Sequence, residues 1–506
     1  MKKLIKLLFS RLFWLIISLA FQLAVLTYLI FASTNYHYVY YFLYALTALM
    51  AIFVVSRDEN PAYKLAWLLL MCVFPFVGVV LYIIFGNKKI TKRASRRLVR
   101  YRDVIDKAIV YDKESMEKVM SEDSRFSRQI EYIYETSRYG VWENTECKYF
   151  SDGDSFLDDL LCEISKAKHF IFIEYFIIGK GYMWTRVLSA LIDKVNEGVE
   201  VRLLYDDLGS INVLPKNYYK ELRSYGIDAH AFNPVRAHLN PRLNYRDHRK
   251  IFCIDGNVCY TGGLNLADEY MNKVIRFGLW KDNAIKIKGD AVWNLTLSFL
   301  LMFRSTTGKS EQFDKYRPTY HGVSDGFVQP FADSPFDGIS VARNAYMQVI
   351  NNARHYIWIV TPYLILDNEM VTALQIAAQS GVDVKIITPN YADKKSVHEV
   401  TRSYYETLAS AGVKIYEYIP GFIHSKTLVS DDQIAFVGTA NMDYRSFYLH
   451  FELSVLFMNS SMVQSVKNDT LKALDHAKEQ TLYEIESTSF PRRLLRSFFG
   501  IFAPAL

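Results

Sequence analysis

Long apolar runs without charged side chains dominate the first 87 residues of the chain. They cover residues 13–32, 36–55 and 65–85, and each reaches the length of about 20 residues that a helix needs to cross a bilayer. We therefore predict an N-terminal membrane region with two or three transmembrane segments. For the first run a cleaved signal peptide is the alternative, but the basic start has no small-residue cleavage site and further runs follow it.

From about residue 150 the pattern changes to short strand-like runs that alternate with helical stretches. The expected strands lie at 170–175, 198–204 and 226–228 in one half and at 356–361, 381–387 and 412–415 in the other. In each half a His-x-Lys strand follows the third of them. Strands that alternate with helices predict an α/β layered fold with largely parallel or mixed sheets. The repeated order predicts two lobes that arose by internal duplication.

These patterns divide the chain into six parts. The expected parts are a membrane region (1–87), a basic helical connector (88–150), a first lobe (151–304), a linker (305–340), a second lobe (341–485) and a C-terminal tail (486–506). The linker is predicted from its content of Gly, Pro, Ser, Thr and Asp. The tail mixes three arginines with apolar residues, which predicts a basic amphipathic helix that lies on the bilayer or docks on the protein body.

The net charge of +6 is modest, but basic residues cluster beside the membrane region. Residues 88–102 contain eight lysines and arginines and no acidic residue. Near a bilayer such a cluster binds anionic phospholipid headgroups with about 1 kcal/mol for each basic residue, and a solvated helix face is the alternative. Because positive charge favours the cytoplasmic side, we expect a multi-pass protein of the cell membrane with cytoplasmic catalytic lobes.

Composition adds two expectations. The chain is 51% hydrophobic and 15% aromatic, which is rich for a purely soluble protein and follows from the N-terminal runs. Its cysteines, at positions 72, 147, 162, 253 and 259, show neither a CxxC pair nor the spacing of a metal site. We therefore expect reduced core cysteines, as in cytosolic proteins.

The candidate chemistry lies in one motif, H-x-K-x4-D-x6-G-[GT]-x-N, that occurs twice without gaps. The first copy contains His248, Lys250, Asp255, Gly263 and Asn265, and the second contains His424, Lys426, Asp431, Thr439 and Asn441. A single His-x-Lys pair on a strand is usually accidental, but two copies in register are not. We infer that each lobe supplies half of one active site.

The residue types of this motif are those that phosphate chemistry needs. His and Lys two positions apart on a strand point to the same face. One imidazole can attack phosphorus while the other protonates the leaving alkoxide. We expect Lys250 and Lys426 to bind phosphate oxygens, with the Asn residues and the backbone at Gly263 and Thr439 as further substrate-binding groups. The set contains no metal cage, so we expect no metal and no cofactor.

The acidic residues of the two halves are assigned by position. Asp255 and Asp431 are counted in the catalytic set, with a purely structural role at the turns where they occur as the alternative. A catalytic histidine also needs a carboxylate that fixes its tautomer. Asp282 and Glu452 each open a strand-like segment after their motif. We expect each to orient a catalytic imidazole, and a surface ion pair is the alternative.

The paired motif resembles the signature of the phospholipase D superfamily. With the N-terminal runs the chain is similar, within that superfamily, to the bacterial cardiolipin synthases. The likeness extends from about residue 40 to the C-terminus, and supporting strings are Tyr205-Asp206-Asp207-Leu208-Gly209-Ser210, Thr361-Pro362-Tyr363 and Asn441-Met442-Asp443-Tyr444-Arg445-Ser446-Phe447. One departure is His450, where the resemblance leads us to expect Asn.

The resemblance implies a two-lobed α/β sandwich with one shared site at the lobe interface; the extra N-terminal run, residues 1–35, is atypical of it. It implies metal-free transfer of a phosphatidyl group from one phosphatidylglycerol to another through a covalent phosphatidyl-histidine, which yields cardiolipin and glycerol. By this analogy we expect His248 to be the nucleophile and His424 the acid and base, although the sequence does not separate the two roles.

Three other functions use the same residues or none of them. A hydrolytic phospholipase D or a nuclease would use water as the acceptor, but membrane segments favour a lipid substrate over a nucleic acid. Transfer to another headgroup, such as phosphatidylethanolamine or a polyol, is the nearest alternative. A catalytically inactive membrane scaffold is the third, and the complete set of motif residues in both copies speaks against it.

Overall fold

The computed structural model describes residues 37–57, 59–86, 113–122, 125–235, 244–309, 312–336, 338–501 and 503, with the isolated positions 17, 21, 24 and 28. The basic cluster at 88–102 and most of the apolar run at 13–32 lie outside them. The chain forms two compact units, described separately below. One comprises Met1–Thr91, Val235–Leu243 and Gly500–Leu506, and the other Lys92–Pro234 and Asn244–Phe499.

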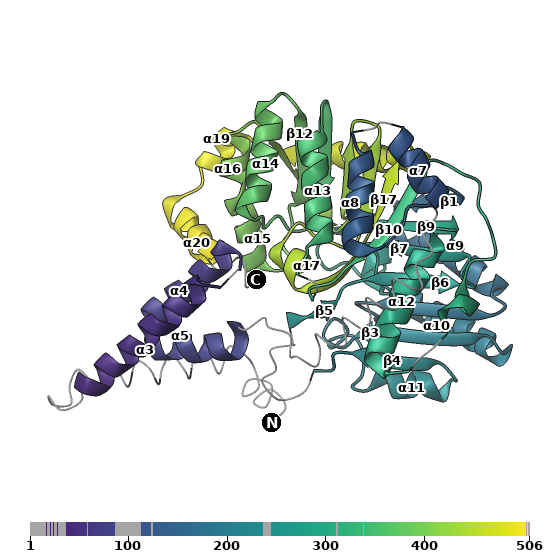
Figure 1. Ribbon diagram of the computed structural model, residues 1–506, viewed down its shortest axis with the longest axis horizontal. Helices are drawn as coiled ribbons and strands as arrows, with labels where there is room; N and C mark the ends of the chain where they lie inside the picture. The colour runs from purple at the N-terminus through teal and green to yellow at the C-terminus, as the bar shows by residue number, and fades with distance from the viewer. Residues whose placement is uncertain are drawn as a thin grey trace. The chain divides into compact units, whose positions relative to one another are not determined.

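The smaller unit contains the N-terminal helices (Figure 1). They are α3 (His37–Val55), α4 (Pro61–Val73) and α5 (Pro75–Leu81), followed by the π-helix η2 (Tyr82–Gly86). The apolar run at 65–85 is therefore interrupted, and the break falls at Phe74. Pro75 has no N–H to continue α4 and disfavours a helical residue before it. No helix in the described part of the chain is both long and apolar enough to span a membrane.

The first lobe of the larger unit is built on a seven-stranded mixed sheet. In spatial order its strands are β1 (Thr145–Phe150), β9 (Ala284–Gly289), β7 (Val258–Gly262), β6 (Lys250–Ile254), β2 (Phe170–Tyr175), β3 (Glu200–Asp206) and β4 (Asp228–Phe232). Helices α9 (Gly153–Lys166), α10 (Tyr182–Asn196) and α11 (Tyr218–Ser224) share one apolar core with this sheet. Their alternation with β2, β3 and β4 confirms the expected α/β order.

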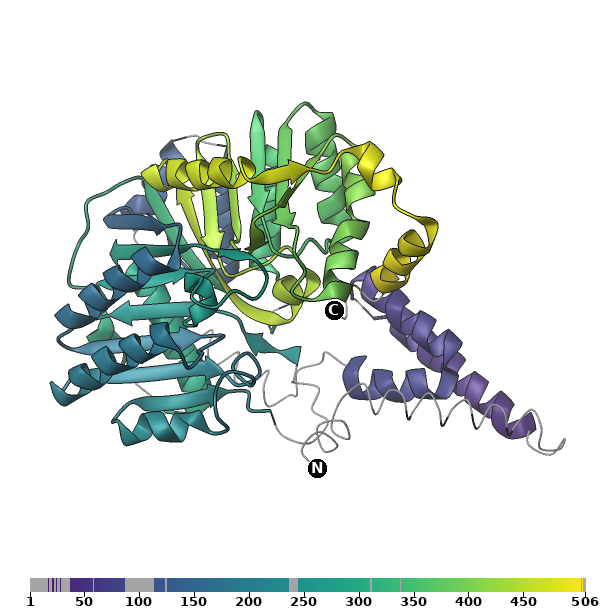
Figure 2. The same ribbon diagram turned by 180° about the vertical axis from the view of Figure 1, so that it is seen from behind.

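The second lobe repeats this plan. Its main strands, in spatial order, are β10 (Phe327–Asp333), β17 (His450–Met458), β16 (Ile434–Gly438), β15 (Thr427–Ser430), β11 (Tyr356–Val360), β12 (Asp383–Pro389), β13 (Lys414–Tyr418) and β18 (Ala477–Glu479). Its helices include α13 (Val341–Asn352), α14 (Asn368–Gln379), α15 (Lys395–Ser403), α16 (Tyr405–Ala409) and α18 (Ser461–Leu474). The internal duplication is confirmed, and Figure 2 shows both sheets from behind.

A continuous apolar core joins the two lobes. It contains Phe172 of the first sheet, Val455 of the second sheet and Phe299 of helix α12 (Val292–Thr307), all with no exposed side-chain surface. Because α12 has apolar residues around most of its circumference, it fits between two sheets rather than on an outer face. The lobes therefore form an α/β sandwich with a shared interior.

The structure moves two of the expected boundaries. Helices α7 (Lys113–Ser121) and α8 (Ser127–Ser137), placed in the connector, pack into the core of the second lobe through Val119 and Ile130. Strand β1, also placed in the connector, belongs to the first sheet, and β10, placed in the linker, belongs to the second. Both strands pair antiparallel with partners more than 100 residues away, so no local pattern reveals their pairing.

The C-terminal helix α20 (Phe490–Ile501) uses its basic side for contacts within the protein. Arg492 and Arg496 pair with Glu399 of α15, and Arg493 pairs with Glu406 of α16. Its apolar residues Phe490, Leu494 and Phe498 are exposed instead. The arginines therefore fit the docked alternative and are not free for lipid headgroups.

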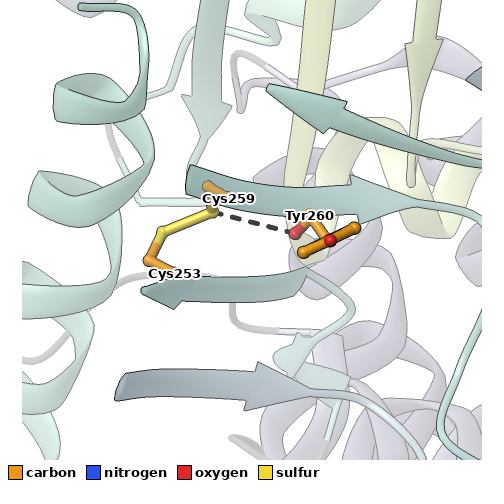
Figure 3. The surroundings of a disulfide bond; sticks show 3 residues. All are labelled: Cys253, Cys259 and Tyr260. Atoms are coloured by element: carbon orange, nitrogen blue, oxygen red, sulfur yellow. Dashed lines mark hydrogen bonds between the residues drawn. A yellow bond between two sulfur atoms is a disulfide. The ribbon is translucent and has the colours of Figure 1, made fainter. Parts of the chain in front are cut away.

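The expectation of reduced core cysteines is wrong both in redox state and in burial. Cys253 of β6 and Cys259 of β7 stand directly opposite each other in the antiparallel ladder and form a disulfide (Figure 3). Cys72 and Cys162 are exposed rather than buried. The tight turn between β6 and β7 brings Cys253 and Cys259 together, although their sequence spacing matches no common redox motif.

Candidate active site

Two short parallel strand pairs cross from one lobe to the other and build the site. Strand β5 (Arg246–Asp247) of the first lobe pairs with the start of β17, and β8 (Leu279–Lys281) pairs with β14 (Gly421–Ile423) of the second lobe. One further backbone hydrogen bond extends each of these pairings. The amide of His248 donates to the carbonyl of Phe451 at 3.0 Å, and the amide of His424 donates to that of Lys281 at 2.7 Å.

This register sets each histidine against a carboxylate of the opposite lobe. His248 Nδ1 lies 3.0 Å from both carboxylate oxygens of Glu452. His424 Nδ1 lies 2.6 Å from Asp282 Oδ2. The carboxylate holds the imidazole proton on Nδ1 and leaves Nε2 with its lone pair, so both imidazoles are oriented in the tautomer that a nucleophile or base needs. The surface ion pair considered for Asp282 and Glu452 is excluded, because both are buried.

Burial controls the protonation of the two imidazoles. It lowers the pKa of His248 well below its ordinary value, and the positive charges of Lys250 and Lys426 lower it further. Burial and Lys426 likewise lower the pKa of His424 to about 4, against the opposing effect of Asp282. Burial alone would raise the pKa of Asp282, but His424 and Lys426 outweigh it and lower that pKa. The site thus holds neutral imidazoles beside an ionised carboxylate.

Lys250 and Lys426 are both buried, and each forms a hydrogen bond with the backbone of the histidine in its own motif. Lys250 Nζ donates to the carbonyl of His248 at 2.7 Å, and Lys426 Nζ donates to the carbonyl of His424. Burial lowers the pKa of Lys250 to about 8 and that of Lys426 to about 7. Asp282 and Glu452 raise both values, which shows that the charges of the two lobes act on one another.

Gly263 and Thr439 support the carboxylates rather than a substrate. A Cβ atom at Gly263 would collide with the carboxylate of Asp282, so only glycine leaves that side chain its place. Thr439 Oγ1 donates to Glu452 Oε2 at 2.5 Å. The backbone amides of Gly263 and Thr439 already donate to the carbonyls of Asn283 and Leu453, at 2.9 and 2.8 Å. Their expected role as substrate-binding donors is therefore not supported.

The sequence of the chain matches known proteins along most of its length. A family profile described as "Cardiolipin synthase, PLD-like domain" matches residues 160–288 and 346–473, and one described as "Phospholipase_D-nuclease N-terminal" matches 45–87. A cardiolipin synthase of Alkalihalophilus pseudofirmus is 34% identical over 90% of this chain and 92% of its own length. Cardiolipin synthase 2 of Bacillus anthracis is also 34% identical, over 90% of both chains.

The chain belongs to the cardiolipin synthase family of the phospholipase D superfamily. Among solved structures, the phosphatidylserine synthase of Haemophilus influenzae Rd KW20 superposes with a TM-score of 0.58 at 14% identity. It covers 76% of this chain and 100% of its own. That likeness supports the two-lobed fold.

The two motif asparagines of this family member differ in their contacts. Asn265 Oδ1 accepts the amide of Ile177 at 3.0 Å, and its Nδ2 donates to the hydroxyl of Tyr270 at 2.6 Å. Asn441 is equally buried, but its Oδ1 has no hydrogen-bond partner among the residues that the structure describes. Asn265 is therefore committed to local structure, and Asn441 stays the better candidate for substrate contact.

The carboxylates of the motif aspartates Asp255 and Asp431 accept backbone amides in their own lobes. They follow strands β6 and β15, and the histidines lie before the same strands begin, so seven residues of mostly extended chain or about 20 Å separate each aspartate from its histidine. Asp255 accepts three backbone amides, of residues 168, 169 and 170, each at 2.8 Å. Asp431 does the same for residues 354–356. These contacts fit the structural alternative, and the assignment of Asp255 and Asp431 to the catalytic set stays a prediction.

A buried ion pair that the motif analysis did not single out anchors one half of the site. Arg246 of β5 places Nε and Nη2 within 2.6–3.0 Å of the Asp206 carboxylate. Asp206 also accepts the amides of Leu208, Gly209 and Asp247. The string that begins at Tyr205 contains this residue, but its partner lies 40 positions away. Asp206 thereby holds the segment that leads into His248.

Proposed function

We propose that this phosphatidyltransferase joins two phosphatidylglycerol molecules into cardiolipin and releases glycerol. The observation that supports the proposal most is the pair of buried histidines, each bonded through Nδ1 to a carboxylate of the other lobe. The relatives named cardiolipin synthase supply the substrate class. Two imidazoles that are each oriented through Nδ1 match a reaction that needs one nucleophile and one proton donor.

In the first step His248 Nε2 attacks the phosphorus of a phosphatidylglycerol. A bond forms between Nε2 and phosphorus, the bond to the glycerol oxygen breaks, and protonated His424 gives its Nε2 proton to the departing oxygen. The phosphodiester anion favours the imidazolium form of His424, which burial alone disfavours. Lys250 and Lys426 balance the charge that develops on the phosphate oxygens.

In the second step the acceptor takes the place of glycerol. His424, now neutral, removes the proton from the terminal hydroxyl of a second phosphatidylglycerol, whose oxygen attacks the phosphorus. The bond to His248 Nε2 breaks, cardiolipin leaves, and His424 again carries the proton. Glu452 and Thr439 keep His248 in one orientation through both steps. We assign the nucleophile to His248 because burial, Lys250 and Lys426 lower its pKa, whereas Asp282 opposes that lowering at His424 and favours its role as proton donor.

We further propose that the N-terminal region anchors the enzyme in the cell membrane, with the catalytic lobes in the cytoplasm. Helix α3 supports this proposal through its exposed apolar and aromatic side chains, which include Tyr38, Phe42, Leu49 and Ile52 at more than 60% exposure. Such a surface is unfavourable in water and favourable in lipid. The positive cluster at 88–102 fits a cytoplasmic position beside anionic headgroups.

The decisive experiment is lipid analysis after incubation of the purified full chain with labelled phosphatidylglycerol. Cardiolipin and free glycerol are expected, and neither is expected from His248→Ala or His424→Ala. Phosphatidic acid as the main product would identify a hydrolase. A product formed only after addition of phosphatidylethanolamine or a polyol would identify a different acceptor.

A further inference from the structure

His450 is a largely buried histidine next to one half of the site. It lies on β17 two residues before Glu452, and 10% of its side chain is exposed. Neither ring nitrogen has a hydrogen-bond partner within the described residues. The His450 and His248 ring centroids are 5.6 Å apart, and His450 Nδ1 lies 3.6 Å from Glu452 Oε1. Buried nitrogens without partners are costly, which makes this cluster a candidate ligand site.

The three side chains have the separations of a transition-metal site. Their ligand atoms all lie within 4.8 Å of one another. Tetrahedral zinc, with bonds of about 2.0–2.1 Å, holds its ligand atoms about 3.3 Å apart. The distances from Glu452 to the Nδ1 atoms of His248 and His450, 3.0 and 3.6 Å, lie on either side of that value. Two of the three separations therefore already lie near the spacing that a bound ion requires.

We propose that His248, Glu452 and His450 form an inhibitory site for zinc and similar divalent transition metals. The ion takes the place of the proton between His248 Nδ1 and Glu452, and exchange through solvent moves that proton to Nε2. The atom that attacks phosphorus then carries the single N–H proton of the neutral imidazole and no longer has a lone pair. The bound metal thus stops the reaction by changing the tautomer of the nucleophile. This inference goes beyond the proposed function.

The other half of the site lacks the third ligand and serves as an internal control. Trp280 stands two residues before Asp282, as His450 does before Glu452. The Trp280 and His424 ring centroids are 5.2 Å apart at 47°, and His450 and His248 show the same angle. An indole N–H donates but cannot bind a cation through a lone pair. We therefore expect one metal ion for each chain.

The nearby lysines set the strength of binding. Lys250 Nζ is held against the carbonyl of His248, and Lys426 acts electrostatically on the same imidazole. Positive charge beside the site opposes a divalent cation, so we expect micromolar affinity, weaker than that of a structural zinc site. At this strength the metal is an inhibitor that chelators remove.

The test is direct zinc binding to the purified full chain, measured by competition with a chromophoric chelator. The natural sequence should bind one equivalent, and Co²⁺ in its place should give visible bands of tetrahedral coordination. His450→Asn should weaken binding at least tenfold, whereas His355→Asn, at an exposed histidine, should leave it unchanged. Equal zinc affinity of the His450→Asn variant and the natural sequence would overturn the proposal.

A variant that gains a zinc site complements the variant that loses one, because poor folding can explain a loss of zinc binding but not a gain. Trp280→His adds the missing ligand to the second half-site and should raise the stoichiometry to two equivalents. A stoichiometry that stays at one would contradict the geometric argument. These measurements use no lipid substrate, so the proposed function can fail while the metal site stands, and the reverse also holds. In the lipid assay, inhibition by zinc should be reversed by EDTA and should be weaker in His450→Asn.

Discussion

The backbone amide of His424 donates a hydrogen bond of 2.7 Å to the carbonyl of Lys281. This bond crosses the boundary between the two lobes. The residue after Lys281 is Asp282, whose carboxylate meets the imidazole of the same histidine. A strand pairing thus decides which carboxylate meets which imidazole. A slip by one residue would turn the acidic side chain to the other face of its strand.

Removal of either orienting carboxylate should slow turnover with little loss of fold. We expect Glu452→Gln and Asp282→Asn each to lower kcat by about 10²–10⁴-fold, because the amide no longer fixes the tautomer of its histidine. Initial rates of cardiolipin formation measure the effect, and Glu479→Gln, at an exposed position, is the matched control. Unchanged kcat in both variants would show that the carboxylates do not act on the histidines.

Asp431 should matter for stability and not for chemistry. Burial opposes its ionisation, but the amides of residues 354–356 outweigh this effect and lower its pKa. Its stabilising effect is therefore full above the unfolded pKa of about 4 and is lost as the pH falls through the lower folded value. Asp431→Asn should cost about 2–3 kcal/mol in urea unfolding at pH 7. The rate per folded molecule should stay near normal.

The matched control for this variant is Asp475→Asn, at an exposed aspartate. It should leave the free energy of unfolding unchanged. A large fall in kcat for correctly folded Asp431→Asn protein would return this residue to the catalytic set.

The pH dependence of kcat/KM should report the buried lysines. Lys426, with a pKa of about 7, is charged below that pH and neutral above it. Binding of the anionic phosphodiester should weaken as this charge is lost, so kcat/KM should decline above pH 7. Lys426→Arg keeps its charge throughout and should move the decline toward pH 8, where Lys250 titrates. Identical profiles for both proteins would exclude Lys426 as the source of the decline.

Chelators should leave catalysis intact. The proposed steps use two imidazoles and two amines, and none of them requires a metal ion. We expect full cardiolipin synthesis in the presence of EDTA, measured after removal of bound metals by dialysis. Loss of activity that is restored by added metal would overturn the metal-free mechanism.

The basic cluster at 88–102 should support activity on anionic membranes through its positive charge alone. Replacement of Arg96, Arg97 and Arg100 by Gln should reduce activity on anionic vesicles more at low salt than at high salt, because salt screens exposed charges. The control neutralises the exposed lysines 216, 220 and 472 of the lobes. An equal loss at both salt concentrations would count against headgroup binding by the cluster.

The alternation of strands and helices and the duplicated motif could be predicted from the sequence, because both depend on neighbours along the chain. The pairing of histidines with carboxylates could not. His248 and Glu452 are 204 residues apart, and His424 and Asp282 are 142 apart. A single sequence offers no measure of such contacts. The exchange between lobes is therefore a property of the tertiary structure.

The errors in the site have a common cause. Spacing along a strand does not say which end of it faces the chemistry, so the motif alone cannot tell whether Asp255 and Asp431 lie near their histidines. Gly263 was expected to approach a phosphate, but it makes room for Asp282. In both cases the residue type indicated a specific role, but the sequence did not show which residue its side chain or backbone contacts. Strands β1 and β10 were missed because their antiparallel partners lie far along the chain.

Neither lobe alone contains a histidine together with the carboxylate that orients it. Each contributes one histidine and the carboxylate that its neighbour's histidine needs, so separation of the lobes would disable nucleophile and acid together. Partial opening cannot leave an oriented nucleophile exposed to water while the proton donor is displaced. The covalent lipid intermediate would form only when the parts that pass it to its acceptor are also assembled. For the proposed phosphatidyl-histidine, this exchange of side chains between lobes would limit wasteful hydrolysis.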